Sequence, residues 1–180
     1  FTIWVNDSAG QLNSSGLYFI IHDSVSPAAL SFVTPTLSND SASQDTYAFI
    51  NLTFNEAHPS ACILQFNGTV NYSMTLNGSD GIGPYCSFNV TSLAEGLHNY
   101  SVFVNDSSGL SVSTALRFFT SDRTAPVVSA VVPSTANVNR SSALNVSANA
   151  SDALSSVLNV SLSFVNGSGT VLYSQSSALS

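Results

Sequence analysis

Lysine is absent from this chain of 180 residues, and its only basic residues are Arg117, Arg123 and Arg140. The net charge is −7, and charged residues make up 7% of the sequence, against about 25% in an average globular protein. Phosphate binding needs clustered Lys and Arg, so the sequence argues against a nucleic-acid partner. A surface this poor in charge also needs another source of hydration, because charge normally keeps proteins in solution.

Long apolar runs are missing as well. Hydrophobic residues make up 44% of the chain, which is enough for a core, but no run approaches the ~18 residues of a membrane span. The sequence shows no signal peptide. Because it begins within a strand pattern at Phe1, we expect a processed or cropped N-terminus.

Recognisable catalytic and metal-binding motifs are also absent. The sequence has no Gly-rich phosphate loop, no G-x-S-x-G and no H-E-x-x-H motif. His22, His58 and His98 are scattered, and the ten acidic residues are too thinly spread for a glycosidase pair. The sequence therefore predicts no enzyme, no catalytic residue and no metal site, with His98 in a structural role.

Cysteine occurs only twice, at Cys62 and Cys86. The two residues are not spaced like zinc ligands, and no histidine lies beside them. In an oxidising compartment they would pair, and closing a loop of that size would stabilise the fold by ~3 kcal/mol. The alternative is two buried free thiols; an extracellular location favours the disulfide.

Asparagine, in contrast, is abundant and follows a pattern. Fifteen of the 17 asparagines begin an Asn-x-Ser/Thr triplet without proline in the middle. The 35 serines and 13 threonines would by chance give about 4.5 such triplets. The triplet is the acceptor of N-linked glycans in secreted proteins, so these counts predict a glycosylated extracellular chain.

The asparagines also fall on one side of the expected strands. In "AFINLTFNE" the apolar residues Ile50, Leu52 and Phe54 share one face, whereas Asn51 lies on the other. A glycan cannot be buried, so this alternation is what glycosylation requires. The better acceptors are predicted to be Asn51, Asn71, Asn89, Asn99, Asn145, Asn149 and Asn159.

Other asparagines have a structural reason to occur or an unfavourable neighbour. The stretches "FNG", "NGSDG" and "NGSG" predict turns, because Asn and Gly both accept a positive φ. Between the first two turns, residues 70–76 are predicted to form one half-buried strand with Asn71 outside. An aspartate in the middle of a triplet disfavours glycan transfer. The poorer acceptors are predicted to be Asn6, Asn13, Asn39, Asn67, Asn77, Asn105, Asn139 and Asn166.

The chain repeats itself. "FTIWVNDSAG" at 1–10 matches "YSVFVNDSSG" at 100–109, an offset of 99, which slips to 94 around Asn51 and Asn145. The repeat consists of short alternating strands broken by turn signals, without a helical period. These features predict an all-β fold of tandem immunoglobulin-like β-sandwiches with a repeat of ~99 residues.

The repeat also predicts the domain boundaries. Residues 24–122 form one complete unit, residues 1–23 match its last two strands, and residues 123–180 match its first part. Two interpretations are open: the chain is a window of a longer array, which we favour, or the N-terminal strand pair of one copy completes the open C-terminal unit of the next. Both predict contacts between neighbouring repeats or copies, head to tail.

One segment carries a family resemblance. "SLAEGLHNYSVFVNDSSGLSVSTALRFFTSDRTAPVV" at 92–128 resembles the end of the immunoglobulin-like repeats of long bacterial and archaeal surface proteins. The matching positions are Leu93, Gly96, His98, Val102, Val104, Asp106, Gly109, Asp122 and Pro126. No acidic residue lies two places before any of the fifteen asparagines, which is more similar to archaeal than to bacterial acceptors.

The resemblance implies a cell-surface array, such as an adhesin stalk, an S-layer component or a filament. In some related arrays, acids at the positions of Asp23 and Asp122 bind Ca²⁺, which needs several oxygen ligands. Few other acids lie near them, so we expect them to cap the junction backbone. The alternative function is an adhesin or carbohydrate-binding module with a ligand held by loops at one end of the sandwich.

Overall fold

The computed structural model describes residues 1–20, 22–78, 84–132 and 144–178. This part of the chain contains strands and no α-helix, and therefore no helix that could cross a bilayer. The strands are β1 (Trp4–Asn6), β2 (Leu12–Ser14), β3 (Ala28–Phe32), β4 (Ser41–Ser43), β5 (Tyr47–Asn55), β6 (Pro59–Phe66), β7 (Val70–Ser73), β8 (Thr75–Asn77), β9 (Tyr85–Thr91), β10 (Gly96–Asp106), β11 (Ser111–Ser113), β12 (Arg117–Ser121), β13 (Val127–Val132), β14 (Ser147–Ser151), β15 (Asn159–Val165) and β16 (Val171–Ala178).

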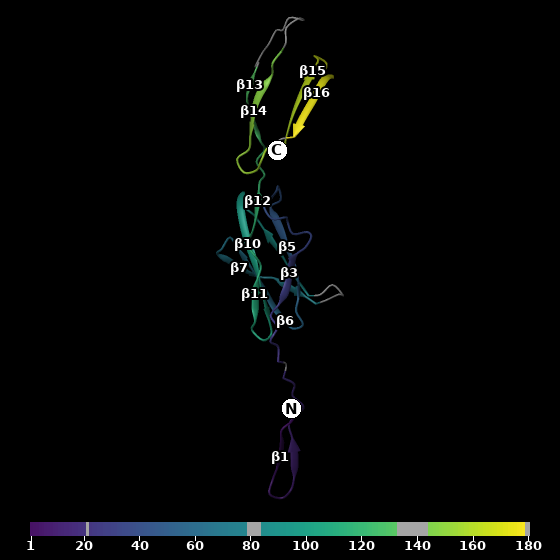
Figure 1. Ribbon diagram of the computed structural model, residues 1–180, viewed down its shortest axis with the longest axis vertical. Coiled ribbons are helices and arrows are strands. Elements are labelled where there is room, and N and C mark those ends of the chain that lie inside the picture. The colour runs from purple at the N-terminus through teal and green to yellow at the C-terminus, as the bar shows by residue number, and fades with distance from the viewer. Residues whose placement is uncertain (21, 79–83, 133–143, 179–180) are drawn as a thin grey trace.

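The central part of the molecule is a sandwich of two sheets (Figure 1). The first sheet has the order β4-β12-β10-β6-β7, with β11 also paired to β10, and the second has the order β3-β5-β9-β8. Neighbouring strands are antiparallel except for β4 and β12, which are parallel. This arrangement confirms the predicted all-β, immunoglobulin-like architecture.

Alternation along the strands builds the core. On β5 the buried side chains are Ala48, Ile50, Leu52 and Phe54, and the residues between them face outward. On β10, in the other sheet, Tyr100, Val102 and Val104 are 1%, 0% and 0% exposed. Burying an aliphatic or aromatic side chain of this size contributes about 1.5–3 kcal/mol. The two inner faces together form one hydrophobic cluster, which holds the sheets against each other.

A disulfide crosses this core. Cys62 lies on β6 in the first sheet and Cys86 on β9 in the second, and their Cα atoms are 6.3 Å apart. This separation is normal for a disulfide. The predicted bond is confirmed, and the alternative of two free thiols is wrong.

The strand predicted for residues 70–76 is wrong in one respect. It divides at Met74 into β7, which pairs with β6, and β8, which pairs with β9. Met74 is buried between the two sheets, and its backbone N–H donates to the Cys62 carbonyl. The apolar alternation continues across this point because the chain passes from one sheet to the other while keeping the same residues inward.

The 99-residue repeat is visible in the strand pairing. In the hairpin β1–β2, Trp4 lies opposite Ser14. In β10–β11, Phe103 lies opposite Ser113, and every pair of this ladder is the first hairpin's pair shifted by 99. The two hairpins therefore have the same register.

The turns of the two hairpins repeat as well. Asp7 Oδ1 accepts a hydrogen bond from the Gln11 N–H at 2.8 Å. Asp106 Oδ1 accepts the corresponding bond from the Leu110 N–H at 2.9 Å. Asp7 and Asp106, each the middle residue of an Asn-Asp-Ser triplet, thus close equivalent turns in the two hairpins.

Outside the sandwich lie three separate two-stranded sheets, β1–β2, β13–β14 and β15–β16. Figure 1 shows β1–β2 at one end of the long axis and the other two at the opposite end. The side chains of these hairpins are mostly exposed, including many apolar ones.

We expect removal of the disulfide to destabilise the sandwich. In a Cys62→Ala/Cys86→Ala variant the free energy of unfolding should fall by about 3 kcal/mol, because the closed loop no longer restricts the unfolded chain. Denaturant titration followed by circular dichroism measures the change. A reductant should lower the midpoint of the parent chain and leave that of the variant unchanged. Identical midpoints for the oxidised and reduced parent would contradict the prediction.

Candidate functional site

The asparagines of the Asn-x-Ser/Thr triplets are the largest set of candidate functional residues. Fourteen of the fifteen lie in the described residues, and Asn139 lies outside them. Ten are exposed: Asn6, Asn13, Asn39, Asn67, Asn71, Asn89, Asn145, Asn149, Asn159 and Asn166. Four are half-buried: Asn51, Asn77, Asn99 and Asn105. Among the described fourteen none is buried, although half of the sheet positions in a sandwich face the core.

Hydrogen bonding separates the asparagines further. Within the described part of the chain, no side-chain hydrogen bond engages the seven predicted better acceptors, and five of the poorer ones are engaged. The engaged residues are Asn13, Asn39, Asn67, Asn77 and Asn166. A glycan is attached to the side-chain amide nitrogen, so a free amide is the better acceptor.

Asn67 shows most clearly what a structural asparagine does. It begins the predicted Asn-Gly turn between β6 and β7, with φ of 50° at Asn67 and 68° at Gly68. Its Oδ1 accepts from the Asn99 N–H at 3.1 Å, and its amide nitrogen lies 3.2 Å from His98 Nδ1. An amide nitrogen only donates here, so His98 Nδ1 is the acceptor and the ring proton sits on Nε2.

His98 completes this cluster from the core. It is 6% exposed and stacks on Phe66 with ring centroids 5.4 Å apart. Its Nε2 donates to the Ala94 carbonyl at 2.9 Å. Both ring nitrogens have protein partners, which supports the structural role expected for this histidine.

The outer face of the second sheet carries Asn51 and Asn89. Asn51 lies opposite Ser87, and Asn89 lies opposite Phe49, across the β5–β9 ladder. These residues line a surface hollow of about 450 Å³ together with Tyr85. Exposed aromatic surface thus lies directly beside two free amides.

The first sheet carries acceptors on its outer face too. Its outward triplet asparagines are Asn71 on β7 and Asn99 and Asn105 on β10. Phe103, which faces outward between Asn99 and Asn105, is 37% exposed. Both outer faces of the sandwich therefore present triplet asparagines next to exposed apolar side chains. Without glycans, these apolar side chains are in contact with water.

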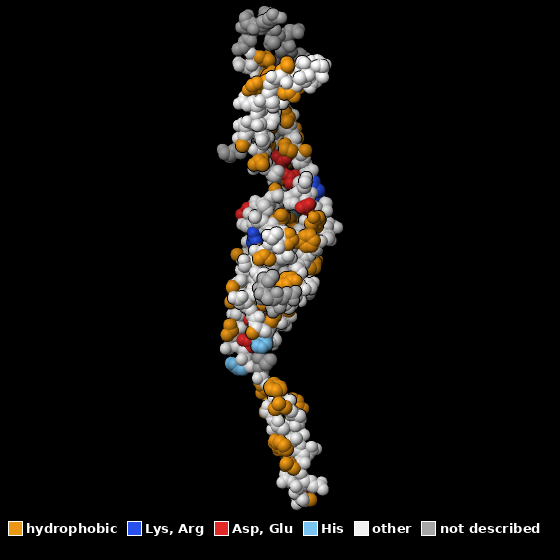
Figure 2. All heavy atoms as spheres, turned by 90° about the vertical axis from the view of Figure 1, so that its right-hand side faces the viewer, with side chains coloured by type: hydrophobic (Ala, Val, Ile, Leu, Met, Phe, Trp, Pro, Cys, Tyr) orange, Lys and Arg blue, Asp and Glu red, His pale blue; other side chains and the backbone are white. Residues whose placement is uncertain are grey.

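Charge contributes little to this surface. Figure 2 shows mainly apolar and uncharged polar side chains on one side of the molecule, with few charged ones. Arg117 lies over the Phe32 ring at 4.8 Å and donates to the Leu37 carbonyl. Arg123 donates to Ser121 Oγ at 2.7 Å. Both described arginines are thus engaged in contacts within the fold.

At the junction before the sandwich, Asp23 meets Glu56 and His58. The ligand-type atoms of these three residues lie within 4.8 Å of one another. Asp23 Oδ1 accepts from the Val25 N–H, Asp23 Oδ2 lies 3.3 Å from His58 Nδ1, and Glu56 accepts from the His58 N–H. Protein groups thus already bond these carboxylates, and imidazole is not among the oxygen ligands that Ca²⁺ takes. The geometry fits the expected capping of the junction.

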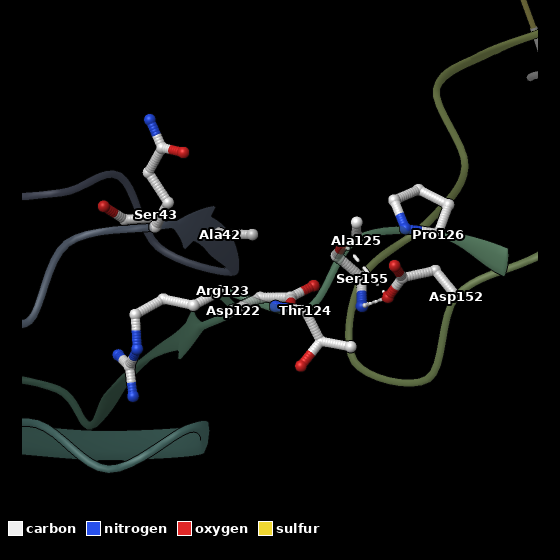
Figure 3. Close-up of a pocket in the computed structure, with 10 residues that line it drawn as sticks. Ala42, Ser43, Asp122, Arg123, Thr124, Ala125, Pro126, Asp152 and Ser155 are labelled. Atoms are coloured by element: carbon white, nitrogen blue, oxygen red, sulfur yellow. Dashed lines mark hydrogen bonds between the residues drawn. The ribbon is translucent and has the colours of Figure 1, made fainter.

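The junction after the sandwich brings Asp122 next to Asp152 (Figure 3). Asp122 Oδ1 accepts from the Thr124 N–H, and Asp152 Oδ1 accepts from the N–H groups of Leu154 and Ser155. Mainly the Ser155 and Leu154 amides, with a smaller contribution from the Ser155 hydroxyl, hold the pKa of Asp152 below its usual value. The two acids line a hollow of about 420 Å³ and cap the turns around it.

The sequence did not identify Glu56 and Asp152 as junction residues. Both lie about 30 residues or more from the aspartate they join, in segments that only the sheet pairing brings together. A signal was present in the repeat: Asn55 pairs with Ala28, and Ser151 pairs with Val127, which lies 99 positions after Ala28. The following residues, Glu56 and Asp152, therefore correspond.

No protein-family model matches the chain, and no curated protein sequence matches it. Fourteen chains of known structure are similar to it. One, described as fibronectin(III)-like modules of Clostridium thermocellum CbhA, is 18% identical with a TM-score of 0.44, over 81% of this chain and 73% of that one. A likeness of this size carries no argument about function.

We expect Asn67 and Asn89 to respond differently to substitution in the unglycosylated chain. Asn67→Ala should lower the free energy of unfolding by about 1–2 kcal/mol, because it removes hydrogen bonds and strains a positive φ. Asn89→Ala should change it by less than about 0.5 kcal/mol. Thermal or denaturant unfolding of both variants measures the difference. Equal effects would show that hydrogen bonding does not distinguish the two classes.

Proposed function

We propose that this chain is a structural segment of an extracellular repeat protein whose sheet faces carry N-linked glycans. The observation that carries the proposal is the position of the triplet asparagines. Ten of the fourteen described ones are exposed, and the seven predicted better acceptors have no side-chain hydrogen bond within the described residues. Their number far exceeds what composition produces.

Two further features support this location and role. The Cys62–Cys86 disulfide is compatible with an oxidising, extracellular compartment. Glycans would also supply the hydration that 7% charged residues cannot provide. Attached at Asn51 and Asn89, they would cover the aromatic surface around Phe49. The repeat suits a stalk, a surface layer or a fibre, in which units follow one another.

The test is a mass measurement on protein from its native host. The bare chain has a mass of 18.8 kDa, and glycosylation should raise it by several glycan units. Peptide mapping should show high occupancy at the seven predicted better acceptors and lower occupancy at Asn67, whose amide is engaged. A native mass equal to that of the polypeptide would refute the proposal. Saturable binding of a soluble carbohydrate by the unglycosylated sandwich would indicate a binding module instead.

A matched pair of variants makes this test specific. Thr91 completes the triplet of Asn89 and is exposed at the end of β9. Thr91→Ala removes the acceptor while leaving Asn89 in place, whereas Thr91→Ser retains it. Expressed in the native host, the first variant should lose the mass of one glycan and the second should not. The same mass for both variants would show that Asn89 is not an acceptor.

A further inference from the structure

In the central sandwich, β10 is the middle strand of the first sheet. It lies between β6 and β12, and its inward side chains Tyr100, Val102 and Val104 are at most 1% exposed. The antiparallel ladder sets these three residues opposite apolar side chains of β6. The pairs are Tyr100 with Phe66, Val102 with Leu64 and Val104 with Cys62.

The hairpin β1–β2 has the register of β10–β11, but no sheet beside it among the described residues. The residues at the positions of the three inward β10 side chains are Phe1, Ile3 and Val5. They are 59%, 57% and 63% exposed. The N-terminal hairpin therefore presents an apolar face that its counterpart in the sandwich buries completely.

At the other end of the molecule, β15 corresponds to β6. Its ladder with β16 has an irregularity between Phe164 and Val165, at which β16 carries one extra residue, Leu172. An offset of 99 would put Ser161 and Ser163 at the positions of the buried Cys62 and Leu64, so the alternation along β15 requires an even offset. We use 98, because 100 would put Asn166 at the position of Phe66. The offset of 98 puts Val160, Leu162 and Phe164 at the positions of Cys62, Leu64 and Phe66.

The other edge of β15 has no strand partner in the described part of the chain. Val160 and Leu162 are 40% and 37% exposed. A hollow of about 690 Å³ lies between β13–β14 and β15–β16, lined among others by Val128, Val146, Ala148, Ala150, Val160 and Leu162. In the central sandwich the corresponding space holds the inward side chains of β10.

We propose that β1 of one copy adds to the free edge of β15 in a second copy, antiparallel, as β10 adds to β6. Transfer of the β10–β6 register predicts the inward pairs Phe1 with Phe164, Ile3 with Leu162 and Val5 with Val160. Each of the three pairs joins two apolar residues. The hollow between the C-terminal hairpins then receives the side chains that the N-terminal hairpin exposes.

Side-chain alternation excludes a register shifted by one residue. A shift of one residue would set Ile3 opposite Ser161 or Ser163 and turn the apolar set of β15 outward. The predicted register places Trp4 opposite Ser161 and Asn6 opposite Asn159, all on the solvent side. Both asparagines stay accessible to glycans, so association and glycosylation are compatible.

The position of the two ends favours a second copy as the partner. Figure 1 shows β1–β2 and β15–β16 at opposite ends of the long axis, so one copy cannot pair its own ends. The contact joins two different surfaces, and such heterologous contacts propagate head to tail unless the rotation closes a ring. This inference concerns the unglycosylated polypeptide and does not depend on the proposed glycans.

Cysteine cross-linking of the full chain tests the register. Trp4→Cys protein is mixed with Ser161→Cys protein under mild oxidation; the native cysteines are already paired with each other. Directly opposite residues lie within disulfide reach, so the covalent heterodimer should be the main product, with the cross-linked peptide identified by mass spectrometry. Trp4→Cys with Ser163→Cys, two positions off register, should give little heterodimer. Equal yields would overturn the register.

A matched pair of variants tests the association itself. Sedimentation velocity of the parent chain should show a mass that rises with concentration. Ile3→Asp, on the inward face, should abolish this rise, whereas Trp4→Asp, on the outward face, should retain it. Both should keep the thermal unfolding of the sandwich, because among the described strands β1 pairs only with β2. A parent chain that stays monomeric at its highest soluble concentration would refute the proposal, whatever its glycan content in the native host.

Discussion

The contact between the inner faces of the two sheets is the interaction on which the rest of this structure depends. Leu52 on β5, Leu64 on β6 and Val102 on β10 are completely buried there. A disulfide joins β6 to β9 across the same layer. Each inner face excludes water only because the other covers it. In the two-stranded sheets outside the sandwich, β1–β2, β13–β14 and β15–β16, no second sheet covers such a face in the described residues, and apolar side chains remain at the surface.

The same constraint shapes the outside of the molecule. Strands that turn every second residue inward must turn the others outward, and here those others are largely Ser, Thr and Asn rather than Lys and Glu. Such a surface has hydrogen-bonding capacity but little charge to prevent association. The exposed and unengaged amides fit a chain hydrated by attached sugar, and the engaged ones, such as Asn67, fit turns and junctions.

Alternation and turn chemistry made much of the fold readable from the sequence. The inward residues of β5, the positive φ values at Asn67 and Gly68 and the Cys62–Cys86 pair follow from local patterns. Three features did not: the change of sheet at Met74, the extra residue at Leu172 and the partners of the junction aspartates. Each depends on which strands lie side by side, and a period of two cannot distinguish one sheet from the other.

Backbone amide hydrogen exchange on the dilute, monomeric chain tests most directly whether stability resides in the closed two-sheet core. The amides of β10, such as those of Val102 and Val104, should exchange slowest, because exposing them requires unfolding of the sandwich. The amides of β15 should exchange orders of magnitude faster, since only β16 pairs with this strand in the described residues. If the β15 amides were as slow as those of β10 in the monomer, the C-terminal hairpins would be stable without further strands, and this account would be wrong.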